Sequence, residues 1–272
     1  MCWTSDHLNW LENTGELLKT ADGKPIQVFE FRCTNDESIM SAWARHFRNH
    51  YCPDCDIDIM RHGTPFSRAE YLNAIKFPDR PAPPGPSIRA GDFGEILVAD
   101  YLQYHLGYWV PRTRYANKDV RNESTKGSDI LGFHFFREGN VSPKDILAIF
   151  EAKAQFVSRQ DKSKLQEAID HSAEDQIRKA ESLNAIKQRF WNSQNMEDLK
   201  KVERFQNPED NPYDEVSGAA ALISSHLFDP DLLSTSNSKN HPNSNNLILI
   251  IIRGESFMDL VHELYRRAAD EA

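Results

Sequence analysis

The 272-residue chain is long enough to bury a full hydrophobic core, and its 39% hydrophobic and 27% charged residues are ordinary for a globular protein. A formal net charge of -9 excludes a surface coated with basic residues for nonspecific nucleic-acid binding, although it is compatible with a local basic groove. The longest apolar run, Leu247 to Ile252, is too short to cross a bilayer, and the first residues lack the layout of a signal peptide, so we expect a cytoplasmic protein without a membrane partner.

Residues 1–77 predict a small N-terminal α/β region. Residues 26–32 alternate apolar and polar side chains, which is typical of a half-buried strand. Asn35-Asp36-Glu37 begins a stretch with helical character that runs towards Tyr51, and Ser67 to Glu70 has the pattern of a capping box at the start of a short helix.

The four cysteines allow two interpretations; they are Cys2, Cys33, Cys52 and Cys55. Cys52 and Cys55 have the spacing of half a zinc site, but no second CxxC follows, and the remaining candidate ligands are His50, His62 and Cys33. Reduced cysteines in or near a core are the favoured interpretation, because disulfide frameworks are rare in cytosolic proteins.

Residues 78–90 separate this region from the rest of the chain. Five prolines stand between residues 78 and 86. Proline fixes φ and removes a backbone donor, so we expect an extended linker that marks a domain boundary. The second domain would then span residues 91–272.

From Gly91 the pattern predicts the order helix, three strands, helix, strand. An apolar helical stripe, with Glu95 at its flank, comprises Phe93, Ile96, Leu97, Tyr101 and Tyr104. The three strands are expected at residues 108–110, 129–136 and 146–153. A long helix from Leu165 to Phe190, buried strands at 219–223 and 247–252, and a closing amphipathic helix follow. These elements predict an α/β fold with a mixed central sheet flanked by helices.

The third of these strands ends in Glu151-Ala152-Lys153. Because side chains alternate across a strand, Glu151 and Lys153 share one face. An acid and a lysine at the end of so apolar a run are unexpected in a core and suggest a functional site. The alternative is an exposed ion pair at the end of a strand, which would contribute little.

Asp129 begins the preceding strand, and a hairpin around Gly139 would bring it close to Glu151. Two neighbouring carboxylates repel each other unless a cation lies between them. Mg²⁺ prefers carboxylate oxygens and shares phosphate oxygens of a substrate, and Glu95 is the candidate third carboxylate. With Lys153 placed to orient a water or to stabilise developing charge, the four residues predict hydrolysis of phosphodiester bonds.

A basic stretch precedes this site and suggests contact with DNA phosphates. Its basic residues are Arg112, Arg114, Lys118, Arg121 and Lys126, against the acidic Asp119 and Glu123. Trp109 and Tyr115 lie among or beside them, and aromatic rings can stack on bases. A solvated loop is the alternative.

His171, Asp175 and His134 are weaker candidates for a role at the site. His171 and Asp175 lie four residues apart on the long helix, and we expect them to support the metal ligands rather than to bind the metal. His134, inside an apolar strand, is interpreted as a core histidine. The chain has no P-loop, GxGxxG or GxSxG signature.

Glu95, Ser128-Asp129 and Glu151-Ala152-Lys153, in the order α-β-β-β-α-β, resemble the restriction-endonuclease-like core of PD-(D/E)xK nucleases. The resemblance implies that Glu95, Asp129 and Glu151 bind Mg²⁺ (or Mn²⁺) and activate water. Ser128 stands where the name of the superfamily expects proline, which is not a catalytic group.

Further stretches resemble the HamA family, the nuclease subunit of Hachiman anti-phage defence, over roughly residues 40–272. The stretches are residues 91–101, 110–115, 126–129, 180–184 and 261–267. This resemblance implies a large DNA helicase partner of superfamily 2 (HamB-like), which restrains the nuclease and releases it on DNA during infection.

Two hypotheses follow. The first is an active Mg²⁺-dependent deoxyribonuclease that acts with a helicase. The second is a catalytically silent subunit that binds DNA or regulates the helicase. The intact set of Glu95, Asp129, Glu151 and Lys153 favours the first. We also expect residues 1–77 and the linker to contact the helicase, because they show no chemistry of their own.

Overall fold

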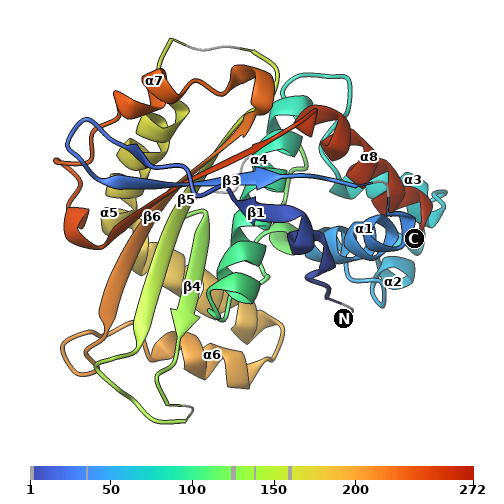
Figure 1. Ribbon diagram of the computed structural model, residues 1–272. Coiled ribbons are helices and arrows are strands. Elements are labelled where there is room, and N and C mark those ends of the chain that lie inside the picture. Colours follow the sequence, from blue (N-terminus) through green and yellow to red (C-terminus); the bar gives the residue numbers. More distant parts are fainter. Residues whose placement is uncertain (1–2, 35, 124–126, 138, 159–160) are drawn as a thin grey trace.

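The computed structural model describes residues 3–34, 36–123, 127–137, 139–158 and 161–272. Its centre is a seven-stranded mixed sheet in the order β1-β3-β7-β6-β5-β4, with β2 paired to β3 outside this path (Figure 1). The strands are β1 (Leu11–Asn13), β2 (Leu18–Lys19), β3 (Pro25–Phe31), β4 (Ile130–His134), β5 (Ile146–Gln155), β6 (Asp214–Ser224) and β7 (Leu247–Gly254). The helices are α1 (Glu37–Tyr51), α2 (Ile57–Arg61), α3 (Arg68–Tyr71), α4 (Gly85–Asp100), α5 (Lys164–Asn192), α6 (Met196–Glu203), α7 (Pro230–Ser234) and α8 (Phe257–Asp270). The expected α/β class, a mixed sheet flanked by helices, is confirmed.

The four central strands β3, β7, β6 and β5 run parallel, and β4 runs antiparallel to β5 at one edge. Their long apolar runs fit strands that are buried on both faces. Gly218 of β6 allows the close packing of Phe150 on β5, since a Cβ at residue 218 would lie 2.2 Å from the Phe150 ring.

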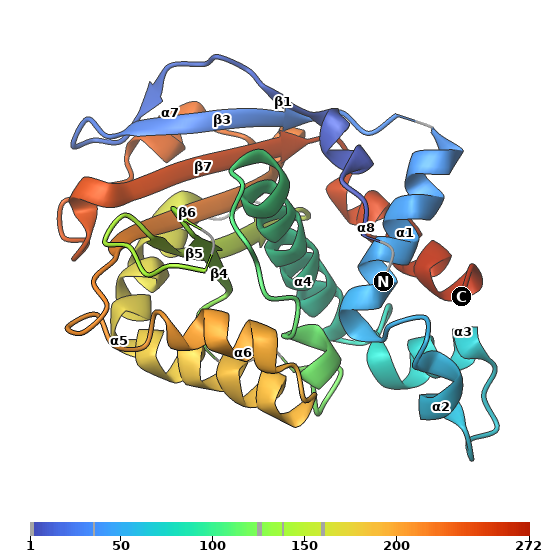
Figure 2. The same cartoon turned by 90° about the horizontal axis from the view of Figure 1, so that it is seen from below.

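Helices cover both faces of the sheet. On one face Phe93 and Leu97 of α4 pack with Phe150 of β5, and α1 and α8 join the same core; Figure 2 shows α4 between the sheet and these two helices. On the other face α5 packs its first half against β6 and β7 and its second half, including Phe190, against β4 and β5. The site described below lies where α4 and α5 approach each other at the β4 edge.

Residues before the proline-rich segment share this sheet and core. β3 pairs with β7 from Ile26 opposite Leu249 to Phe31 opposite Gly254. One buried cluster contains Trp10 and Trp43 together with Phe150. Both ends of the chain lie on the same side of the molecule, near α1 and α8 (Figures 1 and 2).

Most expected elements are confirmed, including the capping box between Ser67 and Glu70. The expectation of an extended linker through residue 90 is wrong, because α4 begins at Gly85 with Pro86 in its first turn, where a missing N–H costs nothing. The strand expected at 108–110 is also wrong. Only Trp109 forms a bridge, to Phe133, and the following Pro111 has no N–H with which to extend the pairing.

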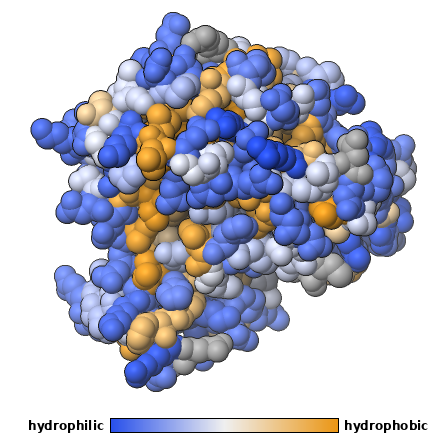
Figure 3. All heavy atoms as spheres, viewed as in Figure 1, coloured by the Kyte–Doolittle hydropathy of each residue, from blue (hydrophilic) through white to orange (hydrophobic). Residues whose placement is uncertain are grey.

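One face of the molecule is mainly hydrophilic. On the face shown in Figure 3, blue side chains predominate and a narrow band of hydrophobic ones lies over the strands. Among the described residues, every helix is too short or too polar to cross a bilayer.

Candidate functional site

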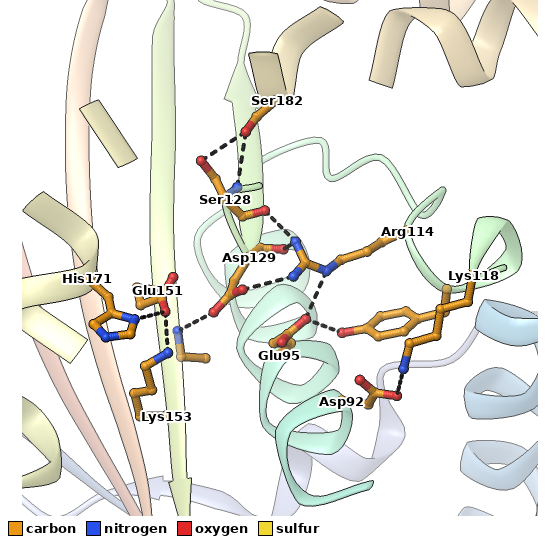
Figure 4. A network of polar contacts seen from close by, with 12 residues as sticks. Asp92, Glu95, Arg114, Lys118, Ser128, Asp129, Glu151, Lys153, His171 and Ser182 are labelled. Carbon is orange, nitrogen blue, oxygen red and sulfur yellow. Dashed lines mark hydrogen bonds and ion pairs between the residues drawn. The ribbon is translucent and has the colours of Figure 1, made fainter. Parts of the chain in front are cut away.

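The expected acids and lysine meet where β4 begins and β5 ends. Asp129 directly precedes β4, whose Ile130 pairs with Phe150 of β5, so Asp129 lies beside Glu151, the residue after Phe150. The backbone N–H of Ala152 donates to Asp129 Oδ2 at 3.3 Å, and Lys153 Nζ lies 2.5 Å from Glu151 Oε1. Figure 4 shows Asp129 between Glu151 and Glu95.

Glu95 reaches the same site from α4, around the β4 edge of the sheet. Arg114 joins it to Asp129: its Nε lies 3.1 Å from Glu95 Oε2, and its Nη2 donates to Asp129 Oδ1 at 3.0 Å. The Tyr115 hydroxyl donates to Glu95 Oε2 at 2.5 Å. Arg114 thus joins a carboxylate of α4 to the carboxylate just before β4.

Burial dominates the electrostatics of this cluster. It raises the pKa of Glu95 to about 8, and the Arg114 charge offsets this only in part. Burial, and then the charge of Asp129, raise the pKa of Glu151 to about 9. Burial alone would lower the pKa of Lys153, but Glu151 beside it raises that pKa above its ordinary value. Several buried acids so close together repel one another when ionised, so an added cation would favour their ionised forms.

His171 and Asp175 of α5 also lie at the site. His171 Nδ1 is 3.5 Å from Glu151 Oε1, and its side chain is partly exposed. Asp175 is 1% exposed, and neither of its oxygens has a hydrogen bond of ordinary geometry. Burial, and then the charge of Asp129, raise the pKa of Asp175 to about 7. Ser128 is the nearest polar partner of Asp175, but it is too poorly aligned for an ordinary hydrogen bond.

These side chains suit a divalent cation by their chemistry, but among the described residues only His46, His50 and Asp100 bring three ligand atoms within 4.8 Å of one another, so the three carboxylates would have to move closer together to bind one. The donors are hard carboxylate oxygens from Glu95, Asp129 and Glu151, which suit Mg²⁺. The guanidinium of Arg114 lies between two of them, so the position already stabilises positive charge. The oxygens of Asp175, which have no hydrogen bond of ordinary geometry, are a further sign that this cluster has capacity for a ligand.

Ser182 of α5 positions Asp129 and was not found from the sequence. Its hydroxyl accepts a hydrogen bond from the Ser128 N–H at 3.0 Å and donates one to Ser128 Oγ at 3.1 Å. A serine on the expected long helix gave no signal, because only the folded chain brings it to the start of β4.

The basic stretch is arranged differently from the expected exposed strip. Arg112 pairs with Asp100 at 2.7 Å, Lys118 pairs with Asp92 at 2.7 Å, and Arg114 pairs as above. Their side chains are 9%, 4% and 13% exposed, so these three cations are largely buried. Lys126 lies outside the described residues.

These cations are buried because the neighbouring helix α4 carries acids that pair with them. Three acids of α4, namely Asp92, Glu95 and Asp100, take up Lys118, Arg114 and Arg112 in that order. Arg121 likewise pairs with Asp79 at 2.7 Å. The three acids of α4 are a signal of such pairing that can be found in the sequence.

A buried histidine cluster lies behind the site. In the described part of the chain His46, His50 and Asp100 form a group that could hold a metal ion, with ligand atoms within 4.8 Å of one another. His7 Nε2 lies 3.0 Å and His46 Nε2 3.1 Å from Asp100. The Thr4 N–H donates to His46 Nδ1 at 3.2 Å, so the proton of this ring is on Nε2, facing Asp100.

That tautomer leaves His46 Nε2 unable to bind a metal, and Arg112 already neutralises Asp100. Burial alone would raise the pKa of Asp100, but His46 and Arg112 lower it well below its usual range. Burial lowers the pKa of His50 well below its ordinary value. The cluster is therefore an ion-paired network that ties α1 to α4.

The expectation of reduced cysteines in or near a core holds for Cys52 only, because Cys33 and Cys55 are exposed and Cys2 lies outside the described residues. Cys52 is buried in the main core, and burial raises its pKa to about 11. Cys33, Cys52 and Cys55 are free thiols. Because zinc binds thiolates, a raised pKa disfavours the half zinc site.

Comparison with known proteins bears on the whole chain. A family model described as HamA matches residues 5–268, nearly the full length and further towards the N-terminus than the resemblance noted above. A search of curated proteins gave no match.

Proposed function

The chain belongs to the HamA family, and we propose from this that it is a Mg²⁺-dependent deoxyribonuclease, the effector subunit of a Hachiman anti-phage defence complex. Membership of the family itself implies a component of Hachiman defence. The observation that carries the proposed activity is the convergence of Glu95, Asp129, Glu151 and Lys153 at one edge of the sheet.

The arrangement of elements supports a PD-(D/E)xK core. α4 comes first, the β4–β5 hairpin carries Asp129 and Glu151, α5 crosses the sheet, and β6 pairs parallel with β5. The expected first strand of the core is reduced to the bridge at Trp109. Ser128, in place of the proline, is anchored by Ser182.

Each side chain has a role that its position supports. Glu95, Asp129 and Glu151 would hold Mg²⁺, which when bound polarises a phosphoryl oxygen and lowers the pKa of water. Lys153, beside Glu151, is placed to orient the attacking water or to stabilise charge that develops on the phosphate. Tyr115 fixes the orientation of Glu95 through its hydroxyl. Arg114, which contacts Glu95 and Asp129, would be placed to bind a phosphate held at these acids.

The partner we propose is a DNA helicase of superfamily 2 that delivers the substrate and restrains the nuclease. The chain has a net charge of -9, and three of its candidate phosphate contacts are buried in ion pairs. Such a protein should bind free DNA weakly. Delivery by a partner would compensate for that weakness.

The test is cleavage of plasmid DNA in Mg²⁺ by the purified chain, with and without the helicase. Glu151→Gln and Lys153→Met should each reduce the rate at least 10²- to 10³-fold, the roughly expected cost of one lost charge-stabilising group. Lys179→Met is the matched control, because it also breaks a lysine–glutamate pair, to Glu215 at 2.6 Å, away from the site. If Glu151→Gln and Lys153→Met both cleave as fast as the wild type, the assignment of the site is wrong. If the wild type does not cleave even with its helicase, the chain is better explained as a catalytically silent, regulatory subunit.

A further inference from the structure

We propose that the cavity beside the carboxylates is a subsite for a phosphate group of the DNA strand, and that Arg189 of α5 is the residue that binds it. The proposal rests on the proposed function, since it names where that substrate is held. No residue of α5 beyond Asp175 was expected at the site from the sequence.

The cavity has a volume of about 60 Å³, well above the ~15 Å³ that one water requires. It is lined by the acids Glu95 and Asp129 and by Arg112, Arg114 and Arg189. Hydroxyls of Thr113, Ser128 and Ser182 line it as well. A phosphate here would meet cationic and hydroxyl donors while touching the oxygens proposed to hold Mg²⁺.

Arg189 differs from the other two arginines of the cavity in its partners. Arg112 is paired with Asp100, and Arg114 with Glu95 and Asp129. Within the ranges that the structure describes, no hydrogen bond or ion pair engages the half-buried side chain of Arg189, although its backbone carbonyl accepts from the Ser193 N–H. Burial, and then the Arg114 charge, lower the pKa of Arg189, so a nearby anion would relieve an unfavourable environment. Arg112 Nη1 is also buried without a hydrogen-bond partner.

A wider groove continues from this cavity. It has a volume of about 540 Å³ and shares Arg112, Thr113 and Arg189 with the cavity. Its walls include Trp3, Trp109 and Phe190, together with the amides of Asn117, Asn192 and Asn195. Aromatic faces and amides suit nucleobases. Arg189 therefore lies where a strand would pass from base contacts to the reacting phosphate.

The guanidinium group matches this task. It binds two phosphate oxygens at once, and it is less strongly hydrated than an ammonium group. The phosphate would be either a terminal monoester or an internal diester, which present the same oxygens. The experiment below separates these two sources.

Binding is measured by fluorescence anisotropy in the full-length Lys153→Met background, with Mg²⁺. The probes are labelled single-stranded oligonucleotides with and without a 5′-phosphate. Arg189→Gln should weaken binding roughly 10- to 100-fold, as expected for lost charge-assisted hydrogen bonds. Arg189→Lys, which keeps the charge, should recover part of the affinity.

Lys187→Gln is the matched control. It removes one positive charge from the same helix, but Lys187 pairs with Glu203 at 2.7 Å rather than facing the cavity. Thermal unfolding of each variant checks that the fold is retained. A loss confined to the phosphorylated probe assigns a terminal phosphate, and an equal loss on both probes assigns an internal one.

The proposal is overturned if Arg189→Gln binds like its parent, or if Lys187→Gln causes the same loss. Failure of the subsite and failure of the proposed function are distinguishable. If the wild type cleaves DNA but Arg189→Gln does not change the affinity for the oligonucleotides, only the subsite proposal is wrong. If the wild type does not cleave DNA but its affinity for the oligonucleotides depends on Arg189, only the proposed nuclease activity is wrong.

Discussion

Arg114 donates from Nη2 to Asp129 Oδ1 at 3.0 Å, in the place between carboxylates that suits a divalent cation. The Arg114 guanidinium thus occupies the position where we propose that the divalent cation binds. The guanidinium and a metal ion should therefore compete for the same oxygens.

Replacing Arg114 with Met should test whether the guanidinium and the metal ion compete for these oxygens. Without a divalent cation the variant should lose about 3–5 kcal/mol of unfolding free energy, because the buried acids lose their partner. Added Mn²⁺ should then stabilise the variant more than it stabilises the wild type. Urea unfolding in EDTA and in Mn²⁺ measures both quantities. Arg178→Met, which breaks an exposed pair with Glu174, is the control, and equal responses of Arg114→Met and wild type to Mn²⁺ would contradict the competition.

Asp175→Asn should change how stability depends on pH. The folded pKa of about 7 is above the ordinary value, so between about pH 4 and 7 the folded state holds a proton that the unfolded chain has released. Stability in EDTA should accordingly fall as pH rises through this window. The variant lacks this loss and should be more stable than wild type at pH 8 by roughly 4 kcal/mol, with little difference at pH 4.

Urea unfolding in EDTA at pH 4, 6 and 8 checks this expectation. Asp170→Asn, an exposed position on the same helix, serves as the control. A wild type and an Asp175→Asn variant with parallel pH profiles would show that Asp175 is ionised without penalty in the folded protein.

Asp100→Asn should destabilise the protein without changing its metal content. The substitution keeps the shape of the side chain but leaves the charge of Arg112 buried and uncompensated, for an expected loss of about 3–5 kcal/mol. Chemical denaturation measures the loss, and elemental analysis of protein equilibrated with zinc measures the metal. Zinc bound by the wild type and lost in the variant would show instead that His46, His50 and Asp100 form a metal site.

Deletion of residues 1–77 should yield an aggregated chain. The deletion removes β3, which pairs with β7 from Ile26 to Phe31, and so exposes an apolar strand edge. Size-exclusion chromatography and circular dichroism check this outcome. A contact with the helicase is better tested by Ile59→Glu on α2, where the side chain is 72% exposed and its loss leaves the core intact. A monomeric, folded deletion variant would show that the sheet tolerates the loss of β3.

The central part of the site could be predicted from the sequence because it depends on local geometry. The period of two in a strand places Glu151 with Lys153, and a hairpin places Asp129 opposite Glu151. The pairing of Arg112, Arg114 and Lys118 depends instead on how a loop lies across α4, which no local pattern encodes. The same holds for Ser182 and Arg189, which α5 brings to the site from more than fifty residues beyond Asp129 in the chain.

The parallel pairing of β3 with β7 also sets an order of events while the protein is being made. Val28 meets Ile251 across the two strands, so the growing chain carries β3 without its main partner until β7 has left the ribosome. At translation rates of about 5–20 residues per second, this wait is on the order of 10–40 s. During it the apolar side chains of β3 need protection, so folding of this protein should depend on chaperones that hold the nascent chain.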